Sequence, residues 1–426
     1  MIEQSEYVAR RERLFEKLEK NSLVVLFSAT QKVRSNDTEY PYRQNSNFYY
    51  LTGFKEDNSA LVMIKEKKKL KTILFVQKKD KTLELWTGKR LGVKKAKKVF
   101  SLEEVYTTEM FEEKMQEYLK SSQNIYYDFG MQDERVQKLQ REASGFFEHK
   151  NIAPLIGMLR LIKSDAEVSL IKKAINITKE AHHRAMKQSK SLSNEYELLA
   201  DIEYTFKKNG AYSDAYTSIV ACGDAANTLH YVSNDKKLID DELILIDAGC
   251  EFEYYASDIT RTIPVNGRFT PAQKELYSMV LDVQLKIIAM IKSGVKRSDL
   301  HTESEMLLCQ GMIRLGLLEG KLKKLLKEKA HKKYYPHGIG HWMGIDVHDE
   351  SPYKTKKGKE IPLEAGMVMT IEPGIYCPKD DMSIPEEYRG IGIRIEDNIL
   401  VTENGCENLS SCIAKSIEEI EEMALN

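Results

Sequence analysis

The first 150 residues alternate between charged amphipathic segments and short apolar runs. A charged helix is expected at about residues 5–20, and the strand-like run LVVLFS follows it at residues 23–28. Four further apolar segments come next: FYYLTGF (48–54), ALVMI (60–64), TILFV (72–76) and NIYYDF (124–129), the last of them between two predicted helices. Strands that alternate with helices are typical of an α/β unit. We therefore expect one α/β domain over residues 1–160.

The remaining residues, 161–426, begin with strong helix-start signals. Ser164 with Glu167 forms a capping box, in which the hydroxyl and the carboxylate satisfy free amides of the first helical turn. Thr270 with Gln273 repeats this pattern, with a proline at the first helical position. Two further predicted helices have these bounds: Ser193 to Gly210, and Ser298 to Gly316.

Apolar runs typical of strands follow each pair of helices. They are TSIVAC (217–222), TLHYV (228–232) and ELILIDAG (242–249) in the first half, then AGMVMTIEPG (365–374) and GIGIRIED (390–397) in the second. Each half thus contains helices, a histidine segment and strands that end in two carboxylates. The halves share no visible sequence identity, and the recurrence is a hint of two similar half-domains that close on one site.

Four carboxylates lie at or near the ends of these apolar strands: Asp247, Asp258, Glu372 and Glu396. A lone buried carboxylate costs several kcal/mol, and neighbouring carboxylates repel each other unless a cation lies between them. Two divalent ions would balance four negative charges, and bridging carboxylates would hold such ions roughly 3.5–4 Å apart. We therefore predict a site for two divalent ions.

The stretch from Gly390 to Glu396 alternates with period two. The isoleucines at 391, 393 and 395 face one side, and the glycines, Arg394 and Glu396 face the other. This second face is smooth and charged, which suits the wall of a cavity, and its glycines allow a close approach to the backbone.

Four of the nine histidines fall in the same segments: His230, His337, His341 and His348. His337 and His341 are four residues apart, but a proline and two glycines around them break a helix, so this is not the helical HExxH zinc motif. On an irregular loop the two histidines can take different roles. Oxygen-rich ligation with one imidazole favours manganese, cobalt, iron or zinc.

The composition of the chain argues against several classes of function. The formal net charge of −1 gives no global field for nucleic acid or anionic lipid, and the lysine-rich stretch KEKKKLK (65–71) is interpreted as a solvated hairpin turn. The six cysteines form no CxxC pair. The amino-terminal residues do not resemble a signal peptide, and no apolar run approaches the roughly 20 residues of a membrane span. We expect a cytoplasmic protein.

At the level of whole segments the chain resembles aminopeptidase P, the Xaa-Pro aminopeptidase of the pita-bread metallopeptidases. The segments that carry the resemblance are YRQNSNFYYLTGF, ELWTGKRLG, NTLHY, LIDAGCEFEYYASDITRTIPVNGRFTPAQ, HGIGHWMGIDVHD, TIEPGIY and YRGIGIRIEDN. They span nearly the whole chain. The resemblance implies a creatinase-like α/β domain over residues 1–160, then an α+β pita-bread catalytic domain over residues 161–426, with a curved antiparallel sheet backed by helices.

The resemblance also implies a set of site residues. The metal ligands would be Asp247, Asp258, His341, Glu372 and Glu396, holding two divalent ions, most often manganese. His230, His337 and His348 would line the substrate cleft and act in catalysis. Arg394 would either orient Glu396 or bind peptide, and Tyr216 and Tyr376 match tyrosines near the site in relatives, where plain core packing is the alternative. Many relatives are dimers or tetramers, so a homo-oligomer is expected.

The implied reaction is the release of the first residue from peptides with proline at the second position. Two bridged ions would lower the pKa of a shared water, the free amine of the substrate would bind one ion, and Glu372 would serve as general base and then as general acid. The alternatives are prolidase, which cleaves Xaa-Pro dipeptides, methionine aminopeptidase, and a relative that binds peptide without cleaving it. Creatinase, which shares the fold, lacks the ligands present here.

Overall fold

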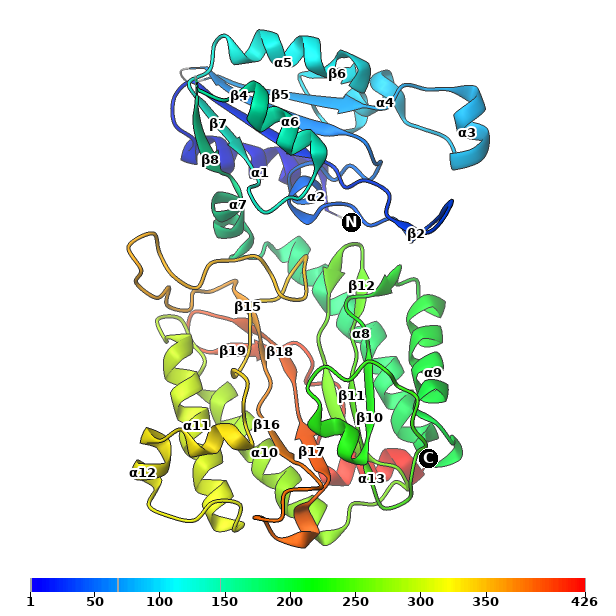
Figure 1. The fold of residues 1–426 in the computed structure, drawn as a ribbon, viewed down its shortest axis with the longest axis vertical. Helices are drawn as coiled ribbons and strands as arrows, with labels where there is room; N and C mark the ends of the chain where they lie inside the picture. Colours follow the sequence, from blue (N-terminus) through cyan, green and yellow to red (C-terminus); the bar gives the residue numbers. More distant parts are fainter. Residues whose placement is uncertain (1, 67–68, 146, 426) are drawn as a thin grey trace. The chain divides into compact units, whose positions relative to one another are not determined.

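The chain forms two compact units in a computed structural model, Met1–Arg160 and Leu161–Asn426. The structure describes residues 2–66, 69–145 and 147–425 (Figure 1). The predicted turn of the lysine-rich stretch falls on residues 67–68, outside the described residues.

A six-stranded mixed sheet forms the centre of the first unit, in the order β6-β5-β4-β1-β7-β8. The strands of the unit are β1 (Ser22–Phe27), β2 (Val33–Ser35), β3 (Thr38–Glu39), β4 (Ala60–Glu66), β5 (Lys69–Val76), β6 (Glu104–Thr107), β7 (Asn124–Tyr127) and β8 (Glu148–Asn151). Every residue of β1 is buried, as expected of a central strand covered on both faces. Side chains of α5 (Phe111–Leu119) and α6 (Glu134–Glu142) pack on one face of this sheet.

The sequence pattern groups the aromatic segment 48–54 with the expected strands, but this segment lies mostly in a helix. This helix is α2 (Ser46–Thr52), which the Asn45 side chain caps and which Gly53 ends with φ 68°. All seven residues of α2 are buried, so the apolar character of the segment reflects full burial and carries no periodicity. The other helices of the unit are α1 (Gln4–Lys17), α3 (Lys81–Thr87), α4 (Gly92–Val99) and α7 (Ala153–Arg160).

The second unit contains two similar sets of helices and strands (Figure 1). In the first set, α8 (Asp165–Gln188) and α9 (Glu195–Lys208) precede the antiparallel strands β10 (Ile219–Cys222), β11 (Leu243–Asp247) and β14 (Thr260–Pro264). Three shorter strands from the same part of the chain form a second sheet: β9 (Ser213–Asp214), β12 (Cys250–Phe252) and β13 (Tyr255–Ala256). Both capping boxes predicted for this unit, Ser164 with Glu167 and Thr270 with Gln273, are confirmed.

In the second set, α10 (Pro271–Met290), α11 (Arg297–Arg314) and α12 (Leu322–Lys327) precede two antiparallel sheets. The strands are β15 (Val368–Ile371), β16 (Gly374–Cys377), β17 (Ile391–Arg394), β18 (Asp397–Val401) and β19 (Cys406–Asn408), and α13 (Ile417–Leu425) follows. Thr262 of β14 joins the two sets, since its hydroxyl donates to the Arg394 carbonyl at 3.0 Å. The Glu396 amide also donates to the Thr260 carbonyl at 3.1 Å.

Three local predictions for this unit were wrong. The segment 228–232 is not a strand; it follows the short 3-10 helix η3 (Gly223–Asn227) as a turn, so His230 lies on a loop. The cap of α9 is Asn194, one residue after the predicted serine. Helix α11 begins at Arg297, and the predicted cap, Ser298, instead donates its hydroxyl to Glu360 at 2.6 Å.

The smooth face of the 390–396 stretch has a clear packing reason. A side chain on Gly392 would come within 2.7 Å of the backbone of Ala226 in η3. The close approach predicted for these glycines is therefore made by the chain itself, which brings the His230 loop beside β17.

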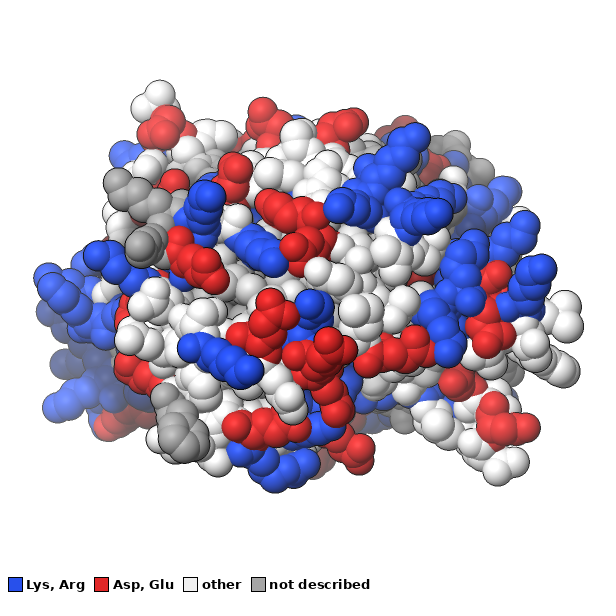
Figure 2. Space-filling view, turned by 90° about the horizontal axis from the view of Figure 1, so that it is seen from above, with Lys and Arg blue, Asp and Glu red and all other residues white. Residues whose placement is uncertain are grey.

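Acidic and basic side chains are interspersed on the face seen in Figure 2. This mixture agrees with the near-zero net charge of the chain. Across the described residues, every helix is too short or too polar to cross a bilayer.

We expect Gly249→Ala to destabilise the second unit. Gly249 follows β11, and a Cβ atom there would lie 1.9 Å from the Ser257 carbonyl oxygen. Such overpacking should lower the free energy of unfolding by about 2 kcal/mol. Gly405→Ala is the control, because its Cβ would meet nothing within 4 Å. Calorimetric melting of both variants checks this, and an equal melting temperature for the two would contradict it.

Candidate metal centre

A cavity of about 350 Å³ in the second unit collects nearly all of the predicted site residues. Its lining includes ten of them: Tyr216, His230, Asp247, Asp258, His337, His341, His348, Glu372, Arg394 and Glu396. Acids from β11 and from the segment before β14 thus meet acids that follow β15 and β17. Acids as far apart in the sequence as Asp247 and Glu396 are thus brought to one place.

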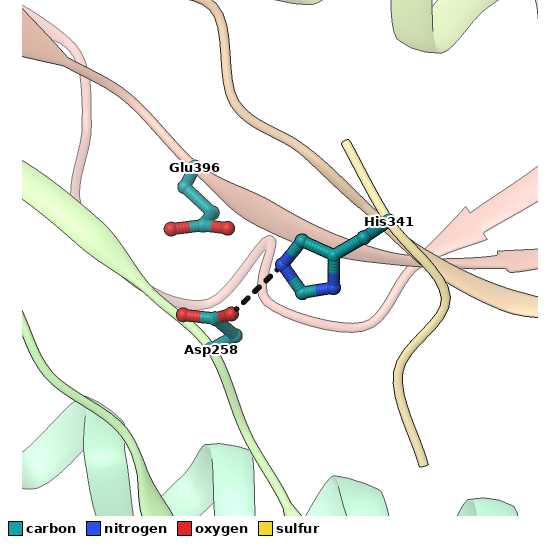
Figure 3. Close-up of side chains that lie close together, drawn as sticks. All are labelled: Asp258, His341 and Glu396. Carbon is teal, nitrogen blue, oxygen red and sulfur yellow. Dashed lines mark ion pairs between the residues drawn. The ribbon is translucent and has the colours of Figure 1, made fainter. Parts of the chain in front are cut away.

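Asp258, His341 and Glu396 form the tightest group (Figure 3). One ligand atom from each lies within 4.8 Å of the others, and His341 Nε2 is 3.2 Å from Asp258 Oδ2. Glu396 is only 2% exposed and Asp258 5%. His341 Nδ1 lies 3.0 Å from the Trp342 carbonyl, which can only accept, so Nδ1 carries a proton. This tautomer leaves Nε2 available to a metal ion, as is usual for ligating histidines.

Asp247 lies at the end of β11 and is held by two side chains. The Tyr216 hydroxyl donates to its Oδ1 at 2.6 Å, and Arg394 Nη2 donates to its Oδ2 at 2.5 Å. Arg394 therefore pairs with Asp247, whereas the two roles expected for this arginine were to orient Glu396 or to bind peptide. Glu396 instead accepts a hydrogen bond from the Thr260 hydroxyl at 2.7 Å.

Glu372 follows β15 directly, opposite the histidine segment. The Glu372 amide donates to the Ile339 carbonyl at 2.9 Å, and the Thr370 amide donates to the His341 carbonyl at 2.9 Å. The segment 339–341 therefore runs alongside β15 although it is irregular, as predicted. Gly340 is required there, because a Cβ atom would lie 1.9 Å from the Thr370 carbonyl oxygen.

His337, which is partly buried and lines the cavity, pairs with the buried Tyr376. Arg394 Nη1 donates to the Tyr376 hydroxyl at 2.9 Å, so that hydroxyl donates onward to His337 Nε2 at 2.8 Å. Burial, with the nearby Arg394 charge, lowers the pKa of His337 to about 3. His337 is therefore neutral. Tyr376 is buried and lies outside the cavity lining, in contrast to Tyr216.

The other two histidines are on the open side of the cavity. His230 and His348 are both exposed, and the ring of His348 lies 4.1 Å from that of His341 between centroids. Exposed imidazoles at the rim of an acidic cavity can donate to a ligand without first breaking a protein contact.

Electrostatics show that the acids are crowded. Burial, reinforced by the charges of Asp258 and Glu372, raises the pKa of Glu396 well above its usual range. Burial raises the pKa of Glu372 to about 7. Burial alone would lower the pKa of His341, but Asp258 and Glu372 outweigh it and raise this pKa to about 9. Without a cation the group must retain protons, which is the behaviour of a site built for positive charge. The donor set fits divalent metal.

Three supporting residues were missed by sequence reasoning: Thr260, Thr370 and Asn398. Thr260 bonds Glu396, and the Thr370 hydroxyl donates to Glu372 Oε1 at 3.1 Å. The Asn398 side chain grips the backbone of Asp258 through both its oxygen, at 3.1 Å, and its nitrogen, at 2.5 Å. Each lies two residues from one of the acids, so the period-two rule could have placed it on the same face.

The whole chain matches known proteins. Residues 169–403 match metallopeptidase family M24, and residues 7–126 match the aminopeptidase P N-terminal domain. The chain is 40% identical over 422 residues to the Xaa-Pro aminopeptidase of Haemophilus influenzae, covering 99% of this chain and 97% of that protein. The chain belongs to the aminopeptidase P group of metallopeptidase family M24. The Escherichia coli Xaa-Pro aminopeptidase is 36% identical over 437 residues, with the same coverage.

Solved aminopeptidase P structures agree along the whole chain. Proline aminopeptidase P II from Yersinia pestis superposes with a TM-score of 0.95 at 37% identity, covering 100% of both chains. Aminopeptidase P from Escherichia coli with the inhibitor Pro-Leu gives 0.93 at 36% identity, covering 100% of this chain and 98% of that one. The expected fold class, a creatinase-like α/β domain followed by an α+β pita-bread domain, is confirmed.

Metal binding to the metal-free protein should release protons, and the affinity for the metal should increase from pH 6 to pH 9. Ligands must lose their protons to bind metal, and the pKa values of Glu372 and His341, about 7 and about 9, lie in this range. Manganese competition titrations at pH 6, 7.5 and 9 measure the effect. His341→Gln, which has no imidazole proton to lose, should show a shallower rise. An affinity that is flat or falls with pH would contradict this assignment.

Proposed function

We propose that this chain is a metal-dependent Xaa-Pro aminopeptidase that releases the first residue of peptides with proline at the second position. The observation that carries the proposal is the convergence of four acids and an imidazole in one cavity of a chain that belongs throughout to the aminopeptidase P group. A relative that only binds peptide would have no need to keep this crowded and costly set of acids.

The ions would be held by Asp247, Asp258, His341, Glu372 and Glu396. We propose two divalent ions, with manganese preferred over cobalt, zinc or iron because oxygen donors dominate the set. One solved relative is described as zinc-substituted Escherichia coli aminopeptidase P in complex with product, which supports divalent metal in general. When bound, the ions would lower the pKa of water and polarise a carbonyl group.

Glu372 is the proposed proton carrier. Its carboxyl group lines the cavity beside the other proposed ligands, where it could take a proton from the nucleophilic water and pass it to the leaving nitrogen. The Thr370 hydroxyl holds Oε1 at 3.1 Å, which fixes the orientation of the carboxyl group. The bond before proline is a tertiary amide, and its leaving nitrogen needs that proton before it departs.

The histidines are proposed to contact the peptide, and Arg394 to orient a metal ligand. His230 and His348, both exposed at the cavity, would donate to peptide carbonyls. His337 is neutral, with Nε2 held by Tyr376, and would contribute mainly shape and a fixed dipole. Arg394 would act by orienting Asp247. A homo-oligomer, dimer or tetramer, remains our expectation.

A peptide panel separates this function from its rivals. With manganese present, Xaa-Pro-Xaa tripeptides should lose their first residue, while peptides with alanine second should not. Chelation should abolish the cleavage and added manganese should restore it, because the ions supply the nucleophile. Faster cleavage of an Xaa-Pro dipeptide would indicate prolidase, and cleavage of Met-Ala-Xaa would indicate methionine aminopeptidase.

Two variants separate metal binding from peptide handling. Asp258→Asn should lower the bound metal below two ions per chain, as elemental analysis measures. His348→Ala should keep its metal but lose about 100-fold in kcat, the usual cost of one stabilising donor. Wild-type metal content in Asp258→Asn would remove that residue from the ligand set. Wild-type kcat in His348→Ala would remove its proposed role.

A further inference from the structure

Behind the acid-bearing strands lies a buried polar cluster that the reaction chemistry does not use. It consists of Arg261 on β14, Gln284 on α10, Asp397 on β18 and Lys415 before α13. Arg261, Gln284 and Asp397 are fully buried. None of the four lines the cavity. We call this group the clamp.

Arg261 uses every N–H group that a guanidinium offers. Its five donors reach five different acceptors: the carbonyls of Thr260 (2.9 Å), Glu396 (2.7 Å), Ala414 (3.0 Å) and Ile413 (3.2 Å), and the Asp397 carboxylate (2.8 Å). Two of these acceptors belong to the acid-bearing segments. One is the backbone of Glu396 itself, and the other lies two residues after Asp258.

Gln284 makes the corresponding contacts to the other segments. Its side-chain nitrogen donates to the carbonyls of Ile395 at 3.0 Å and Ile371 at 3.3 Å. These residues directly precede Glu396 and Glu372. Lys415 fixes the orientation of this amide, because its Nζ donates to the Gln284 oxygen at 2.9 Å.

The Asp397 carboxylate accepts hydrogen bonds from both positively charged side chains of the clamp. It accepts from Arg261 at 2.8 Å, from Ser410 at 2.9 Å, from Asn408 at 2.8 Å and from Lys415. The four clamp residues therefore carry one net positive charge, and only Lys415 among them is partly exposed. That charge lies directly behind the acids that crowd the cavity.

The clamp lies at a break between two strands, where the sheets do not supply these bonds. Strand β17 ends at Arg394 and β18 begins at Asp397, so the carbonyls of Ile395 and Glu396 lie between two ladders. A buried carbonyl without a partner is costly, and here Gln284 and Arg261 provide the donors. Glu396 points into the cavity from the interval between β17 and β18. The backbone of this interval depends on these two side chains for its hydrogen bonds.

We propose that Arg261, Gln284, Asp397 and Lys415 are positioning residues for the metal centre. They hold the backbone beside Asp258, Glu372 and Glu396, so that three of the proposed ligands keep one mutual geometry. This inference rests on the proposed function, because it assigns the clamp a role toward the metal ions. The role goes beyond stability: loosening the clamp should weaken metal binding more than the loss of an equivalent buried contact elsewhere.

The matched test is Gln284→Met against Gln273→Met. Both glutamines are buried on α10, and both donate from the side-chain nitrogen to a backbone carbonyl. The Gln273 contact, to the Asp241 carbonyl at 2.6 Å, precedes β11, whose opposite end carries Asp247, and it does not touch the backbone beside Asp258, Glu372 or Glu396. Three quantities are measured on each protein: the melting temperature, the manganese dissociation constant of the metal-free chain by competition with a chelating dye, and kcat and KM on an Xaa-Pro-Xaa peptide.

Both variants should melt at a lower temperature than the wild type. Only Gln284→Met should raise the manganese dissociation constant, by about tenfold or more, which is the usual effect of losing a contact behind a ligand. Its kcat should fall with it. Equal metal affinity in the two variants would overturn the proposal and leave the clamp a purely structural feature.

Lys415→Met provides a second route if Gln284→Met does not fold. Lys415 is only partly buried, and its loss leaves Arg261 paired with Asp397. Manganese binding weakened by about tenfold is expected, and wild-type binding would refute the clamp. Wild-type protein without metal affinity or peptidase activity would instead count against the proposed function, so the two failures are distinguishable.

Discussion

Repulsion among buried acids is the constraint on which the catalytic unit depends. Asp247, Asp258, Glu372 and Glu396 are brought into one small cavity, and their shared burial raises the pKa of Glu396 and Glu372. The protein answers this repulsion in two ways. Arg394 neutralises Asp247 directly at 2.5 Å, and the remaining charge is left for ions that the site is shaped to receive.

Much of this arrangement follows from local patterns in the sequence. Capping boxes at Ser164 and Thr270 fix the starts of two long helices, because a cap uses only neighbouring residues. The sequence also shows which acids follow an apolar run. Because the run is expected to be buried, its last residue is expected to be buried as well. Glycines in the histidine segment also pointed correctly to irregular backbone there.

What the patterns could not supply are contacts between distant segments. The run 228–232 alternates like a strand, yet no neighbouring strand accepts it, and it forms a turn. Arg394 pairs with Asp247 across 147 residues of sequence, a choice that alternation along one strand does not specify. Asn398 grips the backbone of Asp258 across 140 residues. Such partners depend on which strands become neighbours, and that is decided by the whole core.

The span of the clamp has a consequence for how the site is made. Its members are far apart in the chain, from Arg261 to Lys415, and they join late-synthesised residues to strands that emerge from the ribosome much earlier. Contacts of such long range form slowly, and a domain folds as a unit during synthesis. A partly synthesised chain that ends before Ile413 would therefore lack the carbonyls of Ile413 and Ala414 that anchor Arg261, and the Lys415 ammonium that orients Gln284. Maturation of the metal centre is thereby coupled to the synthesis of this late segment.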